Sequence, residues 1–172
     1  PDYVALLVGP NDICGDGKRD PMTEDSVFQE RIQRAVDTIL TSSKDTKIMI
    51  STIPNIASLR DVAKNAPAFR NPTMNTCLKV WERVTFCKNI QLNEDRAVQF
   101  AAVDRFNQIL RDIAFDANQL NGADRVRVSE AVFNYDFSPD DLAVDCFHPN
   151  YFAQNKLADF TFEDTWWSRE WN

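Results

Sequence analysis

The sequence contains little that would suit a nucleic-acid-binding or membrane-spanning protein. Its 172 residues include 19 Lys and Arg against 26 Asp and Glu, a formal net charge of -7. Phosphate binding needs a concentrated basic face, and no such cluster is visible. No apolar run approaches the roughly 20 residues of a transmembrane helix, since runs such as residues 3–8 and 47–53 have only the length of strands. We therefore expect neither a nucleic-acid partner nor a transmembrane segment.

The chain also lacks an initiator Met and a signal peptide. It starts at Pro1 and is hydrophobic by Tyr3, which suggests an excised piece, so the missing targeting segment says nothing about the compartment. A chain of this length fits one domain with a full core. We therefore expect a single domain over residues 1–172.

The four cysteines are an even number, which allows two disulfides. In one straight helix the Cα atoms of Cys77 and Cys87 would lie about 15 Å apart, beyond the roughly 7 Å that a disulfide bridges. Either the stretch between them bends or these two thiols do not pair. Cys14 and Cys146 each lie within three residues of a candidate site residue and are able to meet near a shared crevice. Four buried free thiols are the alternative, whereas disulfides favour an extracellular or otherwise extracytoplasmic location.

Strand and helix patterns alternate along the chain. Apolar runs predict strands over residues 3–8, 47–53 and 125–133, the first of them covered on both faces. Between the first two strands Thr23 is a suitable helix N-cap, and apolar residues follow at three-and-four spacing: Phe28, Ile32, Ala35, Val36, Ile39 and Leu40.

A second helix is predicted from Glu94 to Asn121-Gly122, with a stripe formed by Val98, Ala102, Phe106, Ile109, Ile113 and Ala117. A third helix is predicted over residues 151–160. The alternation is typical of an α/β fold with a parallel sheet and helices on both faces. Residues 55–93 have a mixed pattern and are predicted to be an insertion or lid-like region, with plain packing elaboration as the alternative.

Two polar motifs follow predicted strands. Gly9-Pro10-Asn11-Asp12 follows the first, and a segment that carries Asp145 and the only histidine, His148, follows the third. Because the carboxyl ends of parallel strands form one binding edge, we expect both motifs at that edge. A carboxylate three residues before an imidazole is a credible acid–base unit.

Each motif has a simpler interpretation. Asn11-Asp12 would also suit an ordinary turn, and the segment with His148 would suit the entry to a helix. A cation site is a third alternative, although the spacing of its candidate ligands matches no known ligand loop: Asp12, Asp16, Asp20, Asp145 and His148.

Together the motifs resemble two sequence blocks of the SGNH (GDSL-type) serine hydrolases. VGPND, which contains Gly9–Asp12, is similar to the G-x-N-D block, and DCFHP, residues 145–149, is similar to the D-x-x-H block. With Cys14 and Cys146 beside the two blocks, the chain is most similar to phospholipase B-like lipases and esterases. The resemblance covers the carboxyl-terminal portion of that family. It implies a flavodoxin-like three-layer α/β/α fold with a parallel sheet, without the family's first two strands.

The resemblance also implies a role for each motif residue. A serine Oγ would attack an acyl-ester or lipid carbonyl, with His148 as its base and Asp145 as the group that orients the imidazole. Asn11 would donate to the oxyanion, Gly9 would let the backbone turn closely beneath the site, and Asp12 would support the loop. No metal and no organic cofactor is implied.

The family's Gly-Asp-Ser block is absent. None of the eight serines follows a strand in such a setting: Ser26, Ser42, Ser43, Ser51, Ser58, Ser129, Ser138 and Ser168. We therefore predict that the nucleophile lies upstream or on another chain, and that a missing amino-terminal segment or second chain covers the edge of the strand Tyr3–Val8. The alternative is a catalytically inactive binding or structural module.

Overall fold

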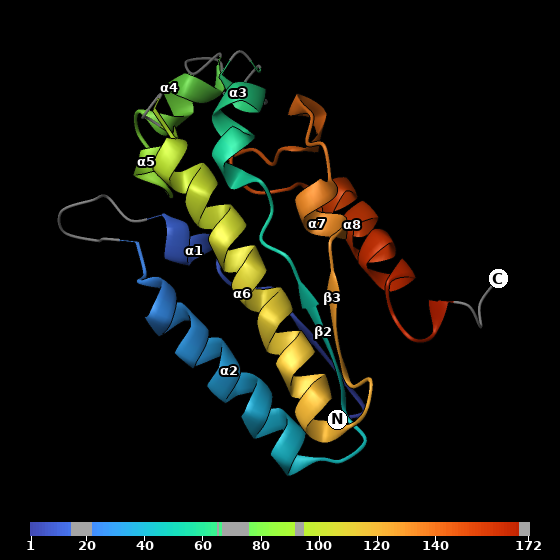
Figure 1. Cartoon of the computed structure of the whole chain (residues 1–172). Helices are drawn as coiled ribbons and strands as arrows, with labels where there is room; N and C mark the ends of the chain where they lie inside the picture. The colour runs from blue at the N-terminus through green and yellow to red at the C-terminus, as the bar shows by residue number, and fades with distance from the viewer. Residues whose placement is uncertain (15–21, 65, 67–75, 92–94, 169–172) are drawn as a thin grey trace.

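The computed structural model describes residues 1–14, 22–64, 66, 76–91 and 95–168. Its elements are shown in Figure 1. They comprise three strands, eight helices and two short 3-10 turns in this described part: β1 Tyr3–Leu6, α1 Pro10–Ile13, α2 Asp25–Ser42, β2 Lys47–Ser51, a 3-10 turn Ile56–Ser58, α3 Leu59–Ala63, α4 Cys77–Trp81, α5 Lys88–Gln91, α6 Ala97–Asn121, β3 Val126–Ser129, α7 Ala131–Asn134, a 3-10 turn Pro139–Asp141 and α8 Tyr151–Glu163.

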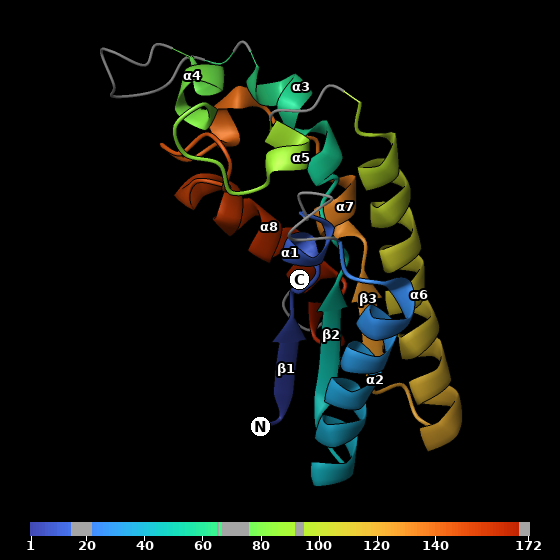
Figure 2. The same ribbon diagram turned by 90° about the vertical axis from the view of Figure 1, so that its left-hand side faces the viewer.

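The three strands form one parallel sheet in the order β1-β2-β3. Tyr3 of β1 is opposite Lys47 of β2, and Ile48 of β2 is opposite Val126 of β3. Each parallel pair is joined by a long helix, α2 in the first crossover and α6 in the second, as parallel pairing requires. Their carboxyl ends all point the same way, toward the part of the molecule that contains α3, α4 and α5 (Figure 2).

The strands are shorter than their apolar runs predict. β1 ends at Leu6, and the next two residues, Leu7 and Val8, are 57% and 37% exposed. The prediction that this first run is covered on both faces is therefore wrong. β3 ends at Ser129 because the chain turns into α7, which takes up the apolar residues expected to extend that strand.

Helices α2 and α6 cover one face of the sheet (Figures 1 and 2). The rings of Phe28 and Phe106 stack between them, with centroids 4.2 Å apart. Most residues of the two predicted apolar stripes are buried or half-buried, but Ala35 and Val98 are exposed. Val98 lies in the first turn of α6, which begins at Ala97, and the buried residues of the helix start at Gln99.

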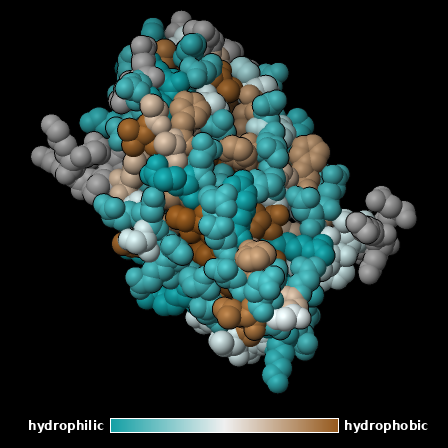
Figure 3. Space-filling model, viewed as in Figure 1, coloured by the Kyte–Doolittle hydropathy of each residue, from teal (hydrophilic) through white to brown (hydrophobic). Residues whose placement is uncertain are grey.

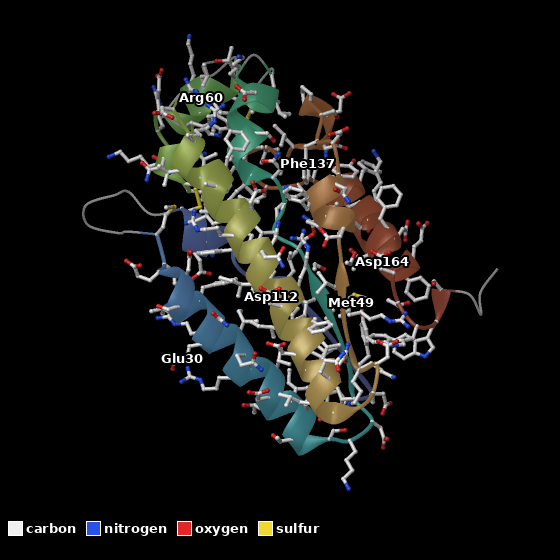
Figure 4. The ribbon with its side chains drawn as sticks, in the orientation of Figure 1. Glu30, Met49, Arg60, Asp112, Phe137 and Asp164 are labelled. Carbon is white, nitrogen blue, oxygen red and sulfur yellow. A yellow bond between two sulfur atoms is a disulfide. The ribbon has the colours of Figure 1, made fainter. Side chains whose placement is uncertain are left out.

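The end of α8 and the residues after it pack on the opposite face. The cationic groups of Lys47 and Arg127 lie over the Trp166 ring, at 5.2 and 4.6 Å from its centroid, and Trp167 contacts the Tyr3 ring edge-on at 5.3 Å. Asp164, labelled in Figure 4, accepts a 2.6 Å hydrogen bond from a serine hydroxyl of β3. The aromatic carboxyl-terminal segment therefore helps to cover the sheet.

The result is a mixed α/β fold with a three-stranded parallel sheet between helical layers, compatible with a three-layer α/β/α arrangement. The face that carries α2 and α6 is largely hydrophilic with scattered apolar patches (Figure 3). Among the described residues β1 pairs only with β2, so its other edge is unpaired. No helix in the described part is both long and apolar enough to cross a membrane.

Candidate active site

Both sequence motifs line one pocket at the carboxyl ends of the strands. Its volume is about 490 Å³, and its lining includes Gly9, Asn11 and Asp12 from the first motif and His148 from the second. Most of the remaining lining is apolar, with contributions from the residues that follow β1 and β2 and from α8. The fold thus brings together two motifs that are more than 130 residues apart in the sequence.

The turn from β1 into α1 depends on Gly9. Its φ of 109° lies in a region that residues with a side chain rarely adopt. A Cβ atom at this position would overlap Ile53 Cδ1 and would lie 2.8 Å from Ile53 Cγ1 and 3.3 Å from Phe28 Cε2. The absence of a side chain lets the backbone of the first motif pack directly against Ile53, two residues after the end of β2.

Asn11 and Asp12 have different surroundings within α1. The Asn11 side chain is exposed at the pocket and makes no hydrogen bond within the part of the chain that the structure describes. Asp12 is held from outside the motif, because Thr23 Oγ1 donates to its carboxylate at 2.7 Å and Thr23 N donates to its carbonyl oxygen at 2.9 Å. Asn11 therefore has free amide protons for a ligand, whereas Asp12 braces the loop.

This contact also corrects the expected start of the first long helix. Thr23 was predicted to be its N-cap, but α2 begins at Asp25 with Glu24 in the cap position. The Thr23 hydroxyl instead bonds to Asp12, across a stretch of chain that no local pattern connects.

Asp145 and His148 form a bonded pair. His148 Nδ1 lies 2.7 Å from Asp145 Oδ2, and the other carboxylate oxygen accepts the backbone N–H groups of Phe147 and His148 at 2.9 and 3.0 Å. An ionised carboxylate only accepts hydrogen bonds, so Nδ1 carries the proton of this bond, and in a neutral imidazole Nε2 is the accepting nitrogen. Nε2 makes no hydrogen bond with any described residue.

The hydrogen bonds lower the pKa of Asp145. Burial by itself would raise the pKa of this carboxyl, but the bonds from His148 and from the backbone N–H groups of Phe147 and His148 outweigh it. The carboxylate is therefore ionised at neutral pH, as a group that orients an imidazole must be. Its side chain is 28% exposed and that of His148 is 55% exposed, so the imidazole remains open to solvent and ligands.

The loop that carries this pair is closed at its base. Leu142 and Pro149 form an antiparallel bridge, and Asn150 N donates to the Asp141 carbonyl at 2.7 Å. Cys146, inside the loop, has a left-handed φ of 62°. Asn150 then caps α8 by accepting from the backbone N–H of the third helical residue. The loop therefore presents His148 from a fixed base rather than from a free-standing turn.

Two disulfides connect the site loops to residues 77–91. Cys14 pairs with Cys87, and Cys77 pairs with Cys146, with Cα–Cα distances of 4.7 and 5.4 Å. The alternative of four free thiols is therefore wrong, and so are the pairs weighed from the sequence, Cys77 with Cys87 and Cys14 with Cys146. Helix α4 ends at Trp81 and the chain turns, so Cys77 and Cys87 bond to different site loops. Two disulfides are compatible with an extracellular protein.

The sequence analysis missed three residues at or beside the pocket. Asn55 follows β2 much as Asn11 follows β1; it lines the pocket, and its buried Oδ1 has no hydrogen-bond partner. Ser58 also lines the pocket, but its hydroxyl donates to the Asn55 carbonyl at 2.7 Å. Phe86 contacts the His148 ring. A polar residue just after a strand was a signal that could have found Asn55; nothing local indicated Phe86.

The structure offers no support for a cation site. Within the described ranges no three His, Cys, Asp or Glu side chains are placed to hold a metal ion together. Asp16 and Asp20, which belong to that sequence-based alternative, lie outside the described residues.

No protein-family model and no curated protein matches this sequence.

Proposed function

We propose that this chain contributes the acid–base pair and an oxyanion donor to a carboxylic-ester hydrolase of the SGNH type, similar to phospholipase B-like lipases and esterases. The observation that supports this proposal most is that Asn11 and His148 line the same pocket and that His148 is hydrogen-bonded to Asp145. The apolar character of the rest of the lining suits the acyl part of an ester or lipid. The two disulfides suit a secreted protein.

The geometry supports a specific division of labour. Nδ1 of His148 donates to Asp145, so Nε2 takes the proton of an attacking hydroxyl and later returns it to the leaving alcohol. Asp145 stabilises the imidazolium formed in between. The Asn11 amide, which has no partner of its own in the described structure, donates to the oxyanion of the tetrahedral intermediate.

The nucleophile belongs to a segment beyond this chain or to a second chain in this proposal. Within the described part of the chain no serine is hydrogen-bonded to His148, and Ser58, a serine that lines the pocket, donates its hydroxyl to the Asn55 carbonyl. The unpaired edge of β1 offers the place for such a segment. A parallel strand added there would end beside Gly9–Asp12, because parallel strands share their carboxyl edge, and it would supply one of the two absent strands of the flavodoxin-like sheet.

The test compares the chain alone with the polypeptide encoded together with its upstream sequence. We expect the chain alone to leave p-nitrophenyl octanoate intact and a fluorophosphonate probe unreacted, because no activated serine is present. The longer polypeptide should turn over the ester, with a loss of about 10²–10³-fold in kcat for Asn11→Ala and at least as large a loss for His148→Ala.

The control variant is Ser58→Ala. If the chain alone reacts with the probe and loses this reaction in both Ser58→Ala and His148→Ala, then Ser58 is the nucleophile and the external serine is wrong. If the longer polypeptide has no activity that depends on Asn11 and His148, the alternative of a binding or structural module replaces the enzyme.

A further inference from the structure

Residues 77–91, here called the bridging segment, are covalently joined to both site loops. Cys87 reaches the loop of Asn11 through Cys14, and Cys77 reaches the loop of His148 through Cys146. These two loops lie at opposite ends of the sequence. The bridging segment is therefore the described element that ties one side of the pocket to the other by covalent bonds, visible in yellow in Figure 4.

One aromatic side chain of the bridging segment touches the imidazole. The Phe86 ring lies 5.1 Å from the His148 ring at an interplanar angle of 69°, and it stacks on Phe147 with centroids 5.7 Å apart. Phe147 contacts His148 edge-on from within the same loop, at 5.2 Å and 88°. Two phenyl rings thus flank an imidazole that is otherwise exposed to solvent.

The backbone around Phe86 is fixed. Phe86 N and Cys87 N both donate to the side-chain oxygen of Gln91, at 2.7 and 2.9 Å, and Gln91 is fully buried. The next residue, Cys87, is held by its disulfide to Cys14. The position of the Phe86 ring is therefore determined by buried and covalent contacts, although the ring itself is 47% exposed.

Phe86 touches the imidazole without contacting the pocket. The described residues that line the pocket include Phe147 and His148 but not Phe86. A bound substrate would consequently meet His148 while Phe86 stays behind it. Any influence of Phe86 on the reaction therefore acts through the two rings that it contacts, His148 and Phe147.

We propose that Phe86 is a positioning residue for His148 and that the disulfide of Cys87 holds it in place. The bond from Nδ1 to Asp145 anchors one edge of the imidazole, and the edge-to-face contact with Phe86 restricts the rotation of the ring about that anchor. This role rests on the proposed function, since the orientation of Nε2 matters only if His148 transfers protons.

The single histidine makes a direct test possible with this chain as it is. In an untagged sample, one set of imidazole signals appears in proton–carbon correlation spectra, and the ring current of Phe86 contributes to their positions. Phe86→Leu, which removes the ring, should displace these signals. Phe86→Tyr should leave them near their wild-type positions, and Val84→Ala, at a half-exposed apolar residue of the same segment, should do the same.

Removal of one disulfide provides the second measurement. The double variant Cys14→Ser/Cys87→Ser, which leaves the bond between Cys77 and Cys146 intact, should displace the His148 signals toward those of Phe86→Leu, because Phe86 loses its anchor. The same double change should move them little further in Phe86→Leu. Signals that are equal in the wild type, Phe86→Leu and Val84→Ala would overturn the proposal, and so would unmoved signals in Cys14→Ser/Cys87→Ser.

Activity separates this proposal from the proposed function. In the polypeptide that hydrolyses the ester, Phe86→Leu should lower kcat about threefold to tenfold with little change in KM, and Phe86→Tyr should restore it. If the imidazole signals respond to substitution of Phe86 but the longer polypeptide has no esterase activity, the proposed hydrolase function is refuted while the contact between Phe86 and His148 is confirmed. Activity that depends on His148 but is unchanged in Phe86→Leu would refute the positioning role alone.

Discussion

Replacing Gly9 by alanine tests how the first site loop is built. Two costs arise at this position. The backbone has φ 109°, and a non-glycine residue in such a conformation costs about 1–2 kcal/mol. The new Cβ would also overlap Ile53 Cδ1 and press on Phe28, and overpacking of this kind costs about 1–3 kcal/mol. The expected loss of unfolding free energy is therefore about 2–5 kcal/mol, a large part of the stability of a small domain.

Gly122 supplies the matched control. It also has a positive φ, 61°, at the end of α6, but no atom lies within 4 Å of the place where its Cβ would be. Gly122→Ala should consequently lower the unfolding free energy only by the backbone cost of about 1–2 kcal/mol. The difference between the two variants isolates the contact between the first site loop and the end of β2.

A double-mutant cycle identifies the atom responsible. Ile53→Val deletes Cδ1 and should cost about 0.5–1.5 kcal/mol by itself, yet in the Gly9→Ala background it should recover about 1 kcal/mol or more. Urea unfolding with the disulfides intact, followed by tryptophan fluorescence and circular dichroism, measures all four free energies. The reasoning fails if Gly9→Ala is no worse than Gly122→Ala, or if the two changes are simply additive.

Three further predictions follow from other contacts. Asn107 is buried and its side chain bonds to both the N–H (2.7 Å) and the carbonyl oxygen (3.1 Å) of Ile53, so Asn107→Leu should lower the unfolding free energy by about 2–3 kcal/mol in the same urea experiment. The control Gln108→Leu, at the exposed neighbouring residue, should change it by no more than about 0.5 kcal/mol. Equal effects of the two substitutions would contradict the stabilising role of the Asn107 hydrogen bonds. Mass spectrometry of a non-reduced digest should find peptides linked through the pairs 14–87 and 77–146, and a 77–87 link would show the connectivity to be different. The lowered pKa of Asp145 stabilises the fold above the pKa of the unfolded carboxyl, about 3.9, and this stabilisation disappears as the pH falls through the lower folded-state pKa. Unfolding free energies measured from pH 6 to pH 3 should therefore fall less steeply in Asp145→Asn than in the wild type. Parallel curves for the two proteins would count against the hydrogen bonds described.

The order of the elements follows from the sequence because it depends on local periodicity. The spacing of apolar residues predicts β1, β2, α2, α6 and α8 close to their observed positions, and α6 ends at Asn121, before Gly122, as predicted. The parallel sheet followed from the alternation of strands and helices, and the presence of Asn11 and His148 in one pocket followed from the rule that parallel strands share a carboxyl edge. Strand ends were less well predicted, since exposure at Leu7 depends on which neighbour covers the strand.

Tertiary contacts decided the rest, because they join residues that no local pattern connects. The spacing of the cysteines left the pairing open, and only the path of residues 77–91 between the two site loops settled which thiols meet. The same path brought Phe86 to the imidazole. Thr23 is a residue type that often caps helices, but here its hydroxyl donates to the Asp12 carboxylate, because a hydroxyl bonds to the acceptor that the fold places nearest. The sequence thus determined which chemical groups the site contains, and the packing of the chain determined what holds them in place.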